Sequence, residues 1–166
     1  MCTMFCMDGK IRIVTVLICG QFILQEAHKM NESMKIRIAH FVLDCTDPSL
    51  LADFYANLLG WDDKRDLGPE WSVVSKPSVS PLLLFQKDTE YEPPVWPNEA
   101  ETQCQMAHID FAVDDIERAI RHAVNCGAKI ADKQYSDKWT VMIDPAGHPF
   151  CFVRNPSLVE SVVKNV

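Results

Sequence analysis

The sequence predicts an α+β fold in which tandem βαβββ modules form two curved sheets around a central cleft. Three observations support this prediction: an internal repeat, strand-like alternation at the start of each half, and an amphipathic helix after each of those strands. The chain has 166 residues, a length that favours one domain with a substantial core.

The repeat appears when the chain is shifted by 68 residues, which aligns residues 36–87 with 104–155 without a gap. The eight identities are Ala39/Ala107, His40/His108, Asp47/Asp115, Asn57/Asn125, Trp71/Trp139, Val73/Val141, Pro77/Pro145 and Pro81/Pro149. Self-similarity at a fixed period indicates a duplicated supersecondary unit. In this alignment Leu83 falls opposite Cys151.

Each half opens with a segment that alternates like a strand, at 36–45 and 106–113. A helix follows, and in the first half Asp47 and Pro48 supply its N-cap and first position, while Gly60 ends it. The apolar faces expected of the helices are Leu50, Leu51, Phe54 and Leu58, then Ile116, Ala119, Ile120, Ala123 and Val124, with Gly127 as the second stop. Further strands are expected near 61–66, 71–75, 82–87, 129–133, 139–143 and 150–154.

These elements define the expected organisation of the chain. Module one spans 35–87, a proline- and acid-rich linker spans 88–105, and module two spans 106–155. A short tail, 156–166, follows this 35–155 domain. Residues 1–33 are an N-terminal extension with three interpretations: upstream sequence before a later start, an extra packed element, or a targeting segment. Its apolar stretch is shorter than the roughly 20 residues that span a bilayer.

Composition narrows the class of partner. The net charge of −7 without a basic run argues against nucleic acid and anionic membrane surfaces, since phosphate binding needs clustered Lys and Arg. The seven cysteines are odd in number and form no CxxC pair, which favours a reducing, cytoplasmic location over a disulfide framework or a zinc ribbon.

Strand alternation predicts where the polar residues lie. In the strand 106–113 the apolar side chains should meet the helix, so His108 and Asp110 face the other way. The same argument places His40 on the uncovered face of the first sheet. Both histidines are therefore expected at a small-molecule site between the sheets.

Several segments resemble the glyoxalase/bleomycin-resistance/dioxygenase (vicinal oxygen chelate) superfamily. The segments that carry the resemblance are AHFVLDCTDPSLLADFYANLLGW, AHIDFAVDDIERAIRHAVNCGAKI and DPAGHPFCFV. The motifs Leu83-Leu84-Phe85-Gln86 and His108-Ile109-Asp110 resemble those of its uncharacterised glyoxalase-like subgroup. The resemblance covers about residues 36–155 and implies a pseudo-twofold pair of modules around a cleft, often in a homodimer.

Metal-dependent members of that superfamily place ligands on the first and fourth strands of each module. The resemblance therefore implies His40, His108 and Cys151 as a metal set, with Asp110 as a fourth ligand or a base. The usual fourth-strand glutamates are absent, and Gln86, the nearest polar residue in the first half, needs a bulge to turn inward. Two further interpretations stay open: pocket-lining histidines without a metal, and metal-free acid/base chemistry by His108 and Asp110.

Aromatic residues supply further candidate ligand contacts. Trp71 and Trp139 are repeat equivalents that either wall a flat ligand or pack in the core. Trp96, in the linker, is a candidate lid over the cleft. Cys151 lies among apolar residues, a setting that raises the pKa of a thiol and argues against a nucleophile.

Two functions follow from these residues. One is a glyoxalase-like lyase or isomerase acting on a small oxygenated substrate, with no cofactor or one divalent metal ion. The other is a non-catalytic binder of an antibiotic-type molecule, for which the acidic charge and the tryptophans favour a cationic aromatic ligand. Metal-dependent glyoxalase I activity and ring-cleaving dioxygenase chemistry are disfavoured because both need the missing carboxylates.

Overall fold

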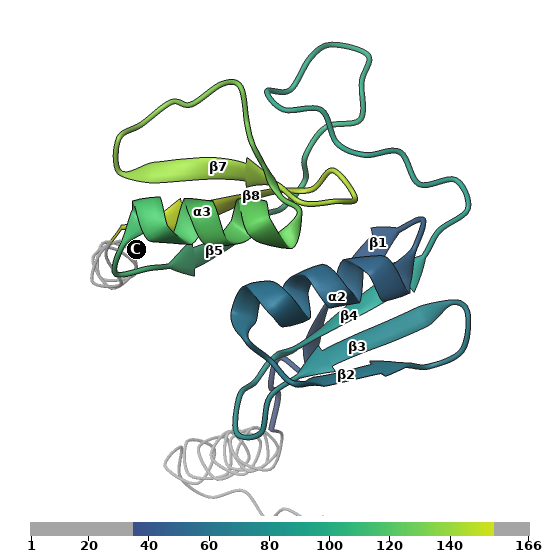
Figure 1. The fold of residues 1–166 in the computed structure, drawn as a ribbon. Coiled ribbons are helices and arrows are strands. Elements are labelled where there is room, and N and C mark those ends of the chain that lie inside the picture. Colours follow the sequence, from purple (N-terminus) through teal and green to yellow (C-terminus); the bar gives the residue numbers. More distant parts are fainter. Residues whose placement is uncertain (1–34, 155–166) are drawn as a thin grey trace, which may run out of the picture. The chain divides into compact units, whose positions relative to one another are not determined.

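A computed structural model describes residues 35–154; the predicted extension 1–33 and tail 156–166 lie outside the described residues. Module one comprises β1 (His40–Cys45), α2 (Pro48–Leu59), β2 (Asp63–Asp66), β3 (Trp71–Ser75) and β4 (Leu82–Lys87). Module two comprises β5 (Ile109–Ala112), α3 (Ile116–Cys126), β6 (Lys129–Ile130), β7 (Trp139–Ile143) and β8 (Pro149–Val153) (Figure 1). The predicted pair of βαβββ modules is confirmed.

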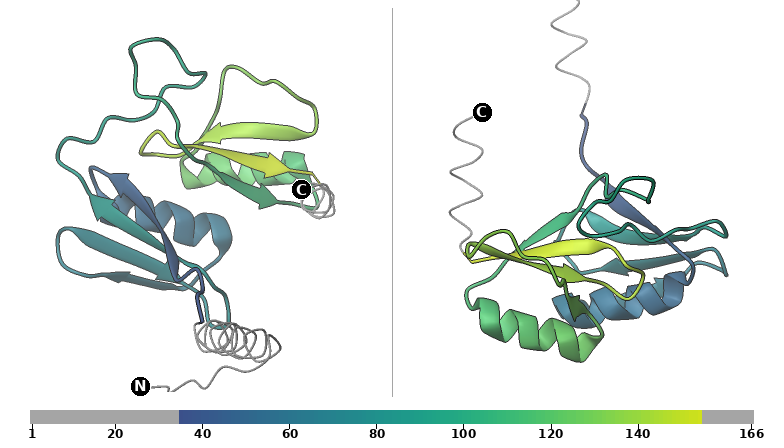
Figure 2. Two further views of the ribbon diagram at one scale, coloured as in Figure 1. Left: turned by 180° about the vertical axis from the view of Figure 1, so that it is seen from behind. Right: turned by 90° about the horizontal axis from the view of Figure 1, so that it is seen from above.

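The two modules share one topology. Their sheets have the orders β1-β4-β3-β2 and β5-β8-β7-β6, so the first strand of each module pairs in parallel with the last. Each helix lies against one face of its own sheet, as Figure 2 shows from two further directions. The opposite face of each sheet has no helix over it among the described elements, and the predicted polar residues belong to that face. None of the described helices is long and apolar enough to cross a membrane.

The helix ends follow the sequence signals. The Asp47 side chain accepts a hydrogen bond from the backbone N–H of Leu50 at 3.0 Å, and Pro48 follows as the first helical residue. Asp115 caps α3 in the same way, with the N–H of Arg118 at 2.9 Å. Gly60 ends α2 at φ 60°, a left-handed conformation that glycine adopts without strain.

The buried face of α2 differs from the predicted one. Leu51, Phe54 and Tyr55 are buried, whereas Leu50 is 56% exposed, so its expected place on the apolar face is wrong. The buried positions follow the i, i+3, i+4 spacing that starts at Leu51 and brings in Tyr55. Val124 of α3 was expected to be buried and is likewise exposed, because Ile116 and Ala123 define the face that packs.

The core is shared between the modules. The ring centroids of Phe54 and Phe150 lie 6.0 Å apart, and those of Tyr55 and Phe111 lie 6.4 Å apart. Tyr55 also stacks on Phe85 within its own module at 5.4 Å. Aromatic pairs at these separations stabilise a core beyond the apolar area that they bury. One hydrophobic core therefore holds both βαβββ units.

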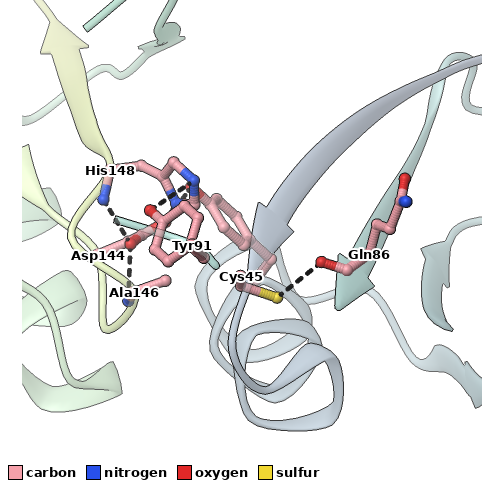
Figure 3. A network of polar contacts seen from close by, with 7 residues as sticks. Cys45, Gln86, Tyr91, Asp144, Ala146 and His148 are labelled. Atoms are coloured by element: carbon pink, nitrogen blue, oxygen red, sulfur yellow. Dashed lines mark hydrogen bonds and ion pairs between the residues drawn. The ribbon is translucent and has the colours of Figure 1, made fainter. Parts of the chain in front are cut away.

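A buried carboxylate joins helix, linker and turn (Figure 3). The Tyr55 hydroxyl donates to Asp144 Oδ2 at 3.0 Å, and the backbone N–H groups of Ala146 and His148 donate to Asp144 Oδ1 at 2.9 Å each. His148 Nδ1 lies 2.9 Å from Asp144 Oδ2, and His148 Nε2 lies 3.0 Å from the Tyr91 hydroxyl. Since a carboxylate only accepts, Nδ1 carries the imidazole proton and Nε2 accepts from Tyr91.

The linker lies close to this turn. A Cβ atom on Gly147, at φ +100°, would come within 2.5 Å of Pro93 Cβ. The turn therefore needs glycine both for its backbone conformation and for the contact with the linker.

Strand pairing corrects the ungapped repeat alignment. Asp110 pairs with Cys151, and the equivalent pair in module one is Val42 and Leu84, so Leu84 rather than Leu83 corresponds to Cys151. The reason is that the turn 144–148 has one residue fewer than the turn 76–81. Gln86 pairs with Asp44 and therefore lies on the uncovered face without the bulge that the ungapped alignment demanded.

Replacing Tyr55 with Phe should lower the free energy of unfolding by about 1–2 kcal/mol, because the buried Asp144 carboxylate loses one donor while the ring still fills the core. Urea denaturation followed by circular dichroism measures the change. Tyr135→Phe is the matched control, since Tyr135 is 59% exposed, and it should stay within error of the parent protein. Equal effects of both substitutions would contradict a role for the Tyr55–Asp144 hydrogen bond.

Candidate functional site

Three chemically active side chains meet on the uncovered face of the second sheet. One ligand atom from each of His108, Asp110 and Cys151 lies within 4.8 Å of the others. Asp110 is on β5, Cys151 is its direct partner on β8, and His108 immediately precedes β5. Residues two apart on an extended chain share a face, and in-register partners on neighbouring strands also share it. Strand pairing brings Asp110 and Cys151 together, and His108 joins them from the residue that precedes β5.

Exposure differs within this group. The side chains of His108 and Asp110 are 41% and 51% exposed, whereas Cys151 is only 7% exposed. His108 Nε2 lies 3.2 Å from Asp110 Oδ1, and its other nitrogen, Nδ1, lies 2.8 Å from Gln105 Nε2. The imidazole is thus held at both nitrogens, while the carboxylate and one edge of the ring remain open to a ligand.

Burial, followed by the negative charge of Asp110 and a hydrogen bond to it, raises the pKa of the Cys151 thiol from 9.0 to about 12. The thiol is therefore protonated at neutral pH and lies beside the carboxylate. This setting agrees with the apolar surroundings expected from the sequence and makes Cys151 a poor nucleophile in the absence of a metal.

The equivalent place in module one lacks this chemistry. His40 occupies the position of His108, but Val42 and Leu84 stand where Asp110 and Cys151 stand. Among the described residues, His40 is not in the group of ligand atoms that lie within 4.8 Å of one another. Both modules therefore have a histidine at this position, but only His108 in module two has polar side chains beside it.

Gln86 and Trp71 form a direct pair on β4 and β3 and share the uncovered face of the first sheet. Trp139, the repeat equivalent of Trp71, pairs with Val153 on the second sheet and is 39% exposed. Both tryptophans thus lie on a sheet face that no described helix covers, where a ligand could contact their rings.

The linker residue Trp96 packs beside the polar group. It contacts the cluster formed by Ala131, Val141 and Cys151, and its indole N–H donates to the Lys133 carbonyl at 2.9 Å. Trp96 also meets Tyr135 edge to face at 5.8 Å. An aromatic side chain from the linker therefore lies against the sheet face that carries Cys151.

Gln105 also belongs to this site, although no sequence pattern predicted its contact with His108. Its spacing of three residues from His108 would place the two side chains on opposite faces of a regular strand. Residues 105–108 precede β5 and are not in a strand, so the chain bends and brings the amide to the imidazole. Its contact with His108 becomes evident only in the folded structure.

Comparisons with known proteins agree with this architecture. A family model described as a glyoxalase-like domain matches residues 40–153. The uncharacterized protein YaeR of Escherichia coli (strain K12) is 27% identical over 124 residues, covering 68% of this chain and 92% of the relative.

Solved structures show the same fold. A glyoxalase/bleomycin resistance protein/dioxygenase family enzyme from Burkholderia phytofirmans PsJN superposes with a TM-score of 0.53 at 13% identity, covering 70% of this chain and 97% of that chain. The trypanothione-dependent glyoxalase I of Leishmania major superposes with a TM-score of 0.54 at 16% identity, covering 79% and 95%. With the family model spanning both modules, the chain belongs to the glyoxalase-like domain family.

Proposed function

We propose that this protein is a small-molecule enzyme of the lyase or isomerase kind, acting on a small oxygenated substrate at His108, Asp110 and Cys151. The supporting observation is the convergence of an imidazole, a carboxylate and a thiol within 4.8 Å on a sheet face that is otherwise mainly apolar. Convergent polar groups in an apolar setting are typical of sites that bind and transform small molecules.

The proposed reaction is proton transfer at a carbon next to a carbonyl group. Asp110 is half exposed and accepts the proton from that carbon, while the electron pair of the C–H bond forms the new C=C bond. His108 Nε2–H, 3.2 Å from Asp110, gives its proton to the carbonyl oxygen and so yields the enediol. Return of a proton to the neighbouring carbon and loss of the hydroxyl proton complete an isomerisation.

As an alternative to this metal-free acid/base pair, the same three residues fit a divalent metal ion. Imidazole nitrogen, carboxylate oxygen and thiolate sulfur form a borderline-soft set that suits zinc, with a fourth position left for water or substrate. Mg²⁺ and Mn²⁺ favour oxygen ligands and fit less well. A bound zinc ion would polarise the substrate carbonyl and deprotonate the coordinating thiol.

A non-catalytic binding protein is the second candidate function. The observation that favours it is the aromatic surface beside the polar group, where Trp96 packs against Tyr135 and Trp139 is 39% exposed. Such a surface, with the net charge of −7, suits a flat cationic ligand. Lys133 lies 5.7 Å from the centre of the Tyr135 ring, so a cationic ligand would compete with this side chain.

The enzyme proposal is tested by solvent exchange. Wild-type protein in D₂O should incorporate deuterium next to the carbonyl in at least one member of a panel of α-hydroxy carbonyl compounds, measured by proton NMR. Asp110→Asn should lower the exchange rate at least ~100-fold because the proton acceptor is lost. His40→Ala is the matched control and should retain exchange. Saturable quenching of tryptophan fluorescence by cationic aromatic compounds, without exchange or turnover in either panel, would instead support the binding protein.

The zinc proposal is tested by metal analysis of protein prepared with zinc supplied. About one equivalent of zinc should be retained by wild-type and His40→Ala protein, and affinity should fall at least ~10-fold in His108→Ala and Cys151→Ser. Binding should release a proton, because the Cys151 thiol is protonated before coordination. Equal zinc content in His108→Ala and wild-type protein would exclude this site as the zinc ligand set.

Without added metal, Cys151 should resist alkylation. Its raised pKa leaves little thiolate at pH 8, so iodoacetamide should modify Cys151 at least ~100-fold more slowly than the exposed Cys104. Peptide mapping by mass spectrometry at timed intervals measures both rates. The protection should weaken as the pH rises, because a larger fraction of the thiol is then ionised. Fast labelling of Cys151 at pH 8 would contradict its burial.

A further inference from the structure

We propose that Trp96, in the linker, is a specificity-determining residue that restricts the candidate site to α-hydroxy carbonyl compounds with a short substituent. This inference rests on the proposed function of His108 and Asp110 and names the class of substrate that their site admits. The supporting observation is that Trp96 covers part of a sheet face over which no described helix lies.

The covered part is an apolar row of Cys151, Val141 and Ala131 that starts beside Asp110. Asp110 pairs with Cys151, and Cys151 pairs in turn with Val141. The backbone N–H of Ala131 donates to the Val141 carbonyl at 3.1 Å and so continues the row. Because paired residues on neighbouring strands share a face, the apolar row extends from the carboxylate across the second sheet.

The apolar row is buried, although the face on which it lies has no described helix over it. Val141 is 1% exposed, Ala131 and Cys151 are also buried, and Trp96 packs against this cluster. Leu84, the counterpart of Cys151 in module one, is only partly buried despite its larger side chain. Trp96 therefore acts as a cover that begins next to Asp110, whose own side chain is half exposed.

Two contacts hold Trp96 in this position. Its indole N–H donates to the Lys133 carbonyl, and its ring meets Tyr135 edge to face. The segment that carries these partners is fixed by the Gln134 amide, which accepts from the Val141 N–H at 2.8 Å and donates to the Val141 carbonyl at 2.9 Å. Since the indole N–H is already used, Trp96 offers a ligand only the apolar surface of its ring.

The position of the cover limits the size of a substrate. Neighbouring strands lie roughly 5 Å apart, so a substrate with its reacting carbon at Asp110 reaches Cys151, and with it Trp96, after about one strand spacing. An apolar substituent favours the apolar row over solvent. A methyl group fits into the distance before the cover, whereas a phenyl group directed along the row has to displace the indole.

The test compares two ketones that share the reacting CH₂OH–C=O group: hydroxyacetone, which carries a methyl group, and 2-hydroxyacetophenone, which carries a phenyl group. Deuterium incorporation at the CH₂OH carbon, followed by proton NMR, gives an exchange rate for each ketone. Trp96→Ala should raise the phenyl-to-methyl rate ratio at least ~10-fold over wild type, because the apolar row is then open to the larger group. Trp96→Phe is the matched control and should keep the wild-type ratio, since its ring retains most of the bulk.

Hydroxyl-radical footprinting with mass spectrometry measures the cover without any turnover. Oxidation of Cys151 should rise several-fold in Trp96→Ala and stay at the wild-type level in Trp96→Phe. Cys45, buried in the core cluster, is the internal reference and should not change.

The inference would be overturned by unchanged Cys151 oxidation in Trp96→Ala, or by an unchanged rate ratio in exchanging protein. Equal increases at Cys151 and Cys45 would also overturn it, because they indicate a loosened fold rather than an opened cover. If no protein exchanges either ketone but Cys151 oxidation alone rises, the proposed function fails and Trp96 remains the cover of the apolar row.

Discussion

Parallel pairing of β5 with β8 is the constraint on which the candidate site depends. Because paired residues point to the same side of a sheet, the pairing of Asp110 with Cys151 fixes the thiol beside the carboxylate. The next pair, Phe111 with Phe152, then points under α3 and joins the core. One register therefore gives module two both its packed side and its reactive side, and a shift of one residue would exchange them.

Local signals in the sequence were enough to predict the modules and one edge of the site. Asp47 and Gly60 indicated where α2 begins and ends. The two-residue spacing of His108 and Asp110 indicated that both lie on the same face of the sheet. Such features depend on neighbours along the chain, where backbone geometry dictates the outcome. The position of Cys151 beside Asp110 depends on a pairing between distant strands, and the ungapped alignment misjudged the corresponding strand in module one.

The sequence could not predict the contacts that the modules make with each other and with the linker, for a different reason. Nothing local marks Tyr55 as the partner of Asp144, since the two are 89 residues apart and meet only when both modules pack on one core. The contact between Gln105 and His108 arises where the chain leaves regular strand geometry, so periodicity arguments do not apply to it. The Tyr55–Asp144 contact is also buried, and burial lowers the dielectric around a polar group and makes each partner energetically important.

The short turn 144–148 has an evolutionary consequence. The equivalent turn of module one, residues 76–81, is one residue longer, and Leu84 and Cys151 still occupy equivalent positions in their ladders. The loop thus absorbs the loss or gain of one codon, so after a gene duplication the chemistry of one copy can change by substitutions on the open face alone. The sibling copy would retain its stability, because no buried residue there would have to change.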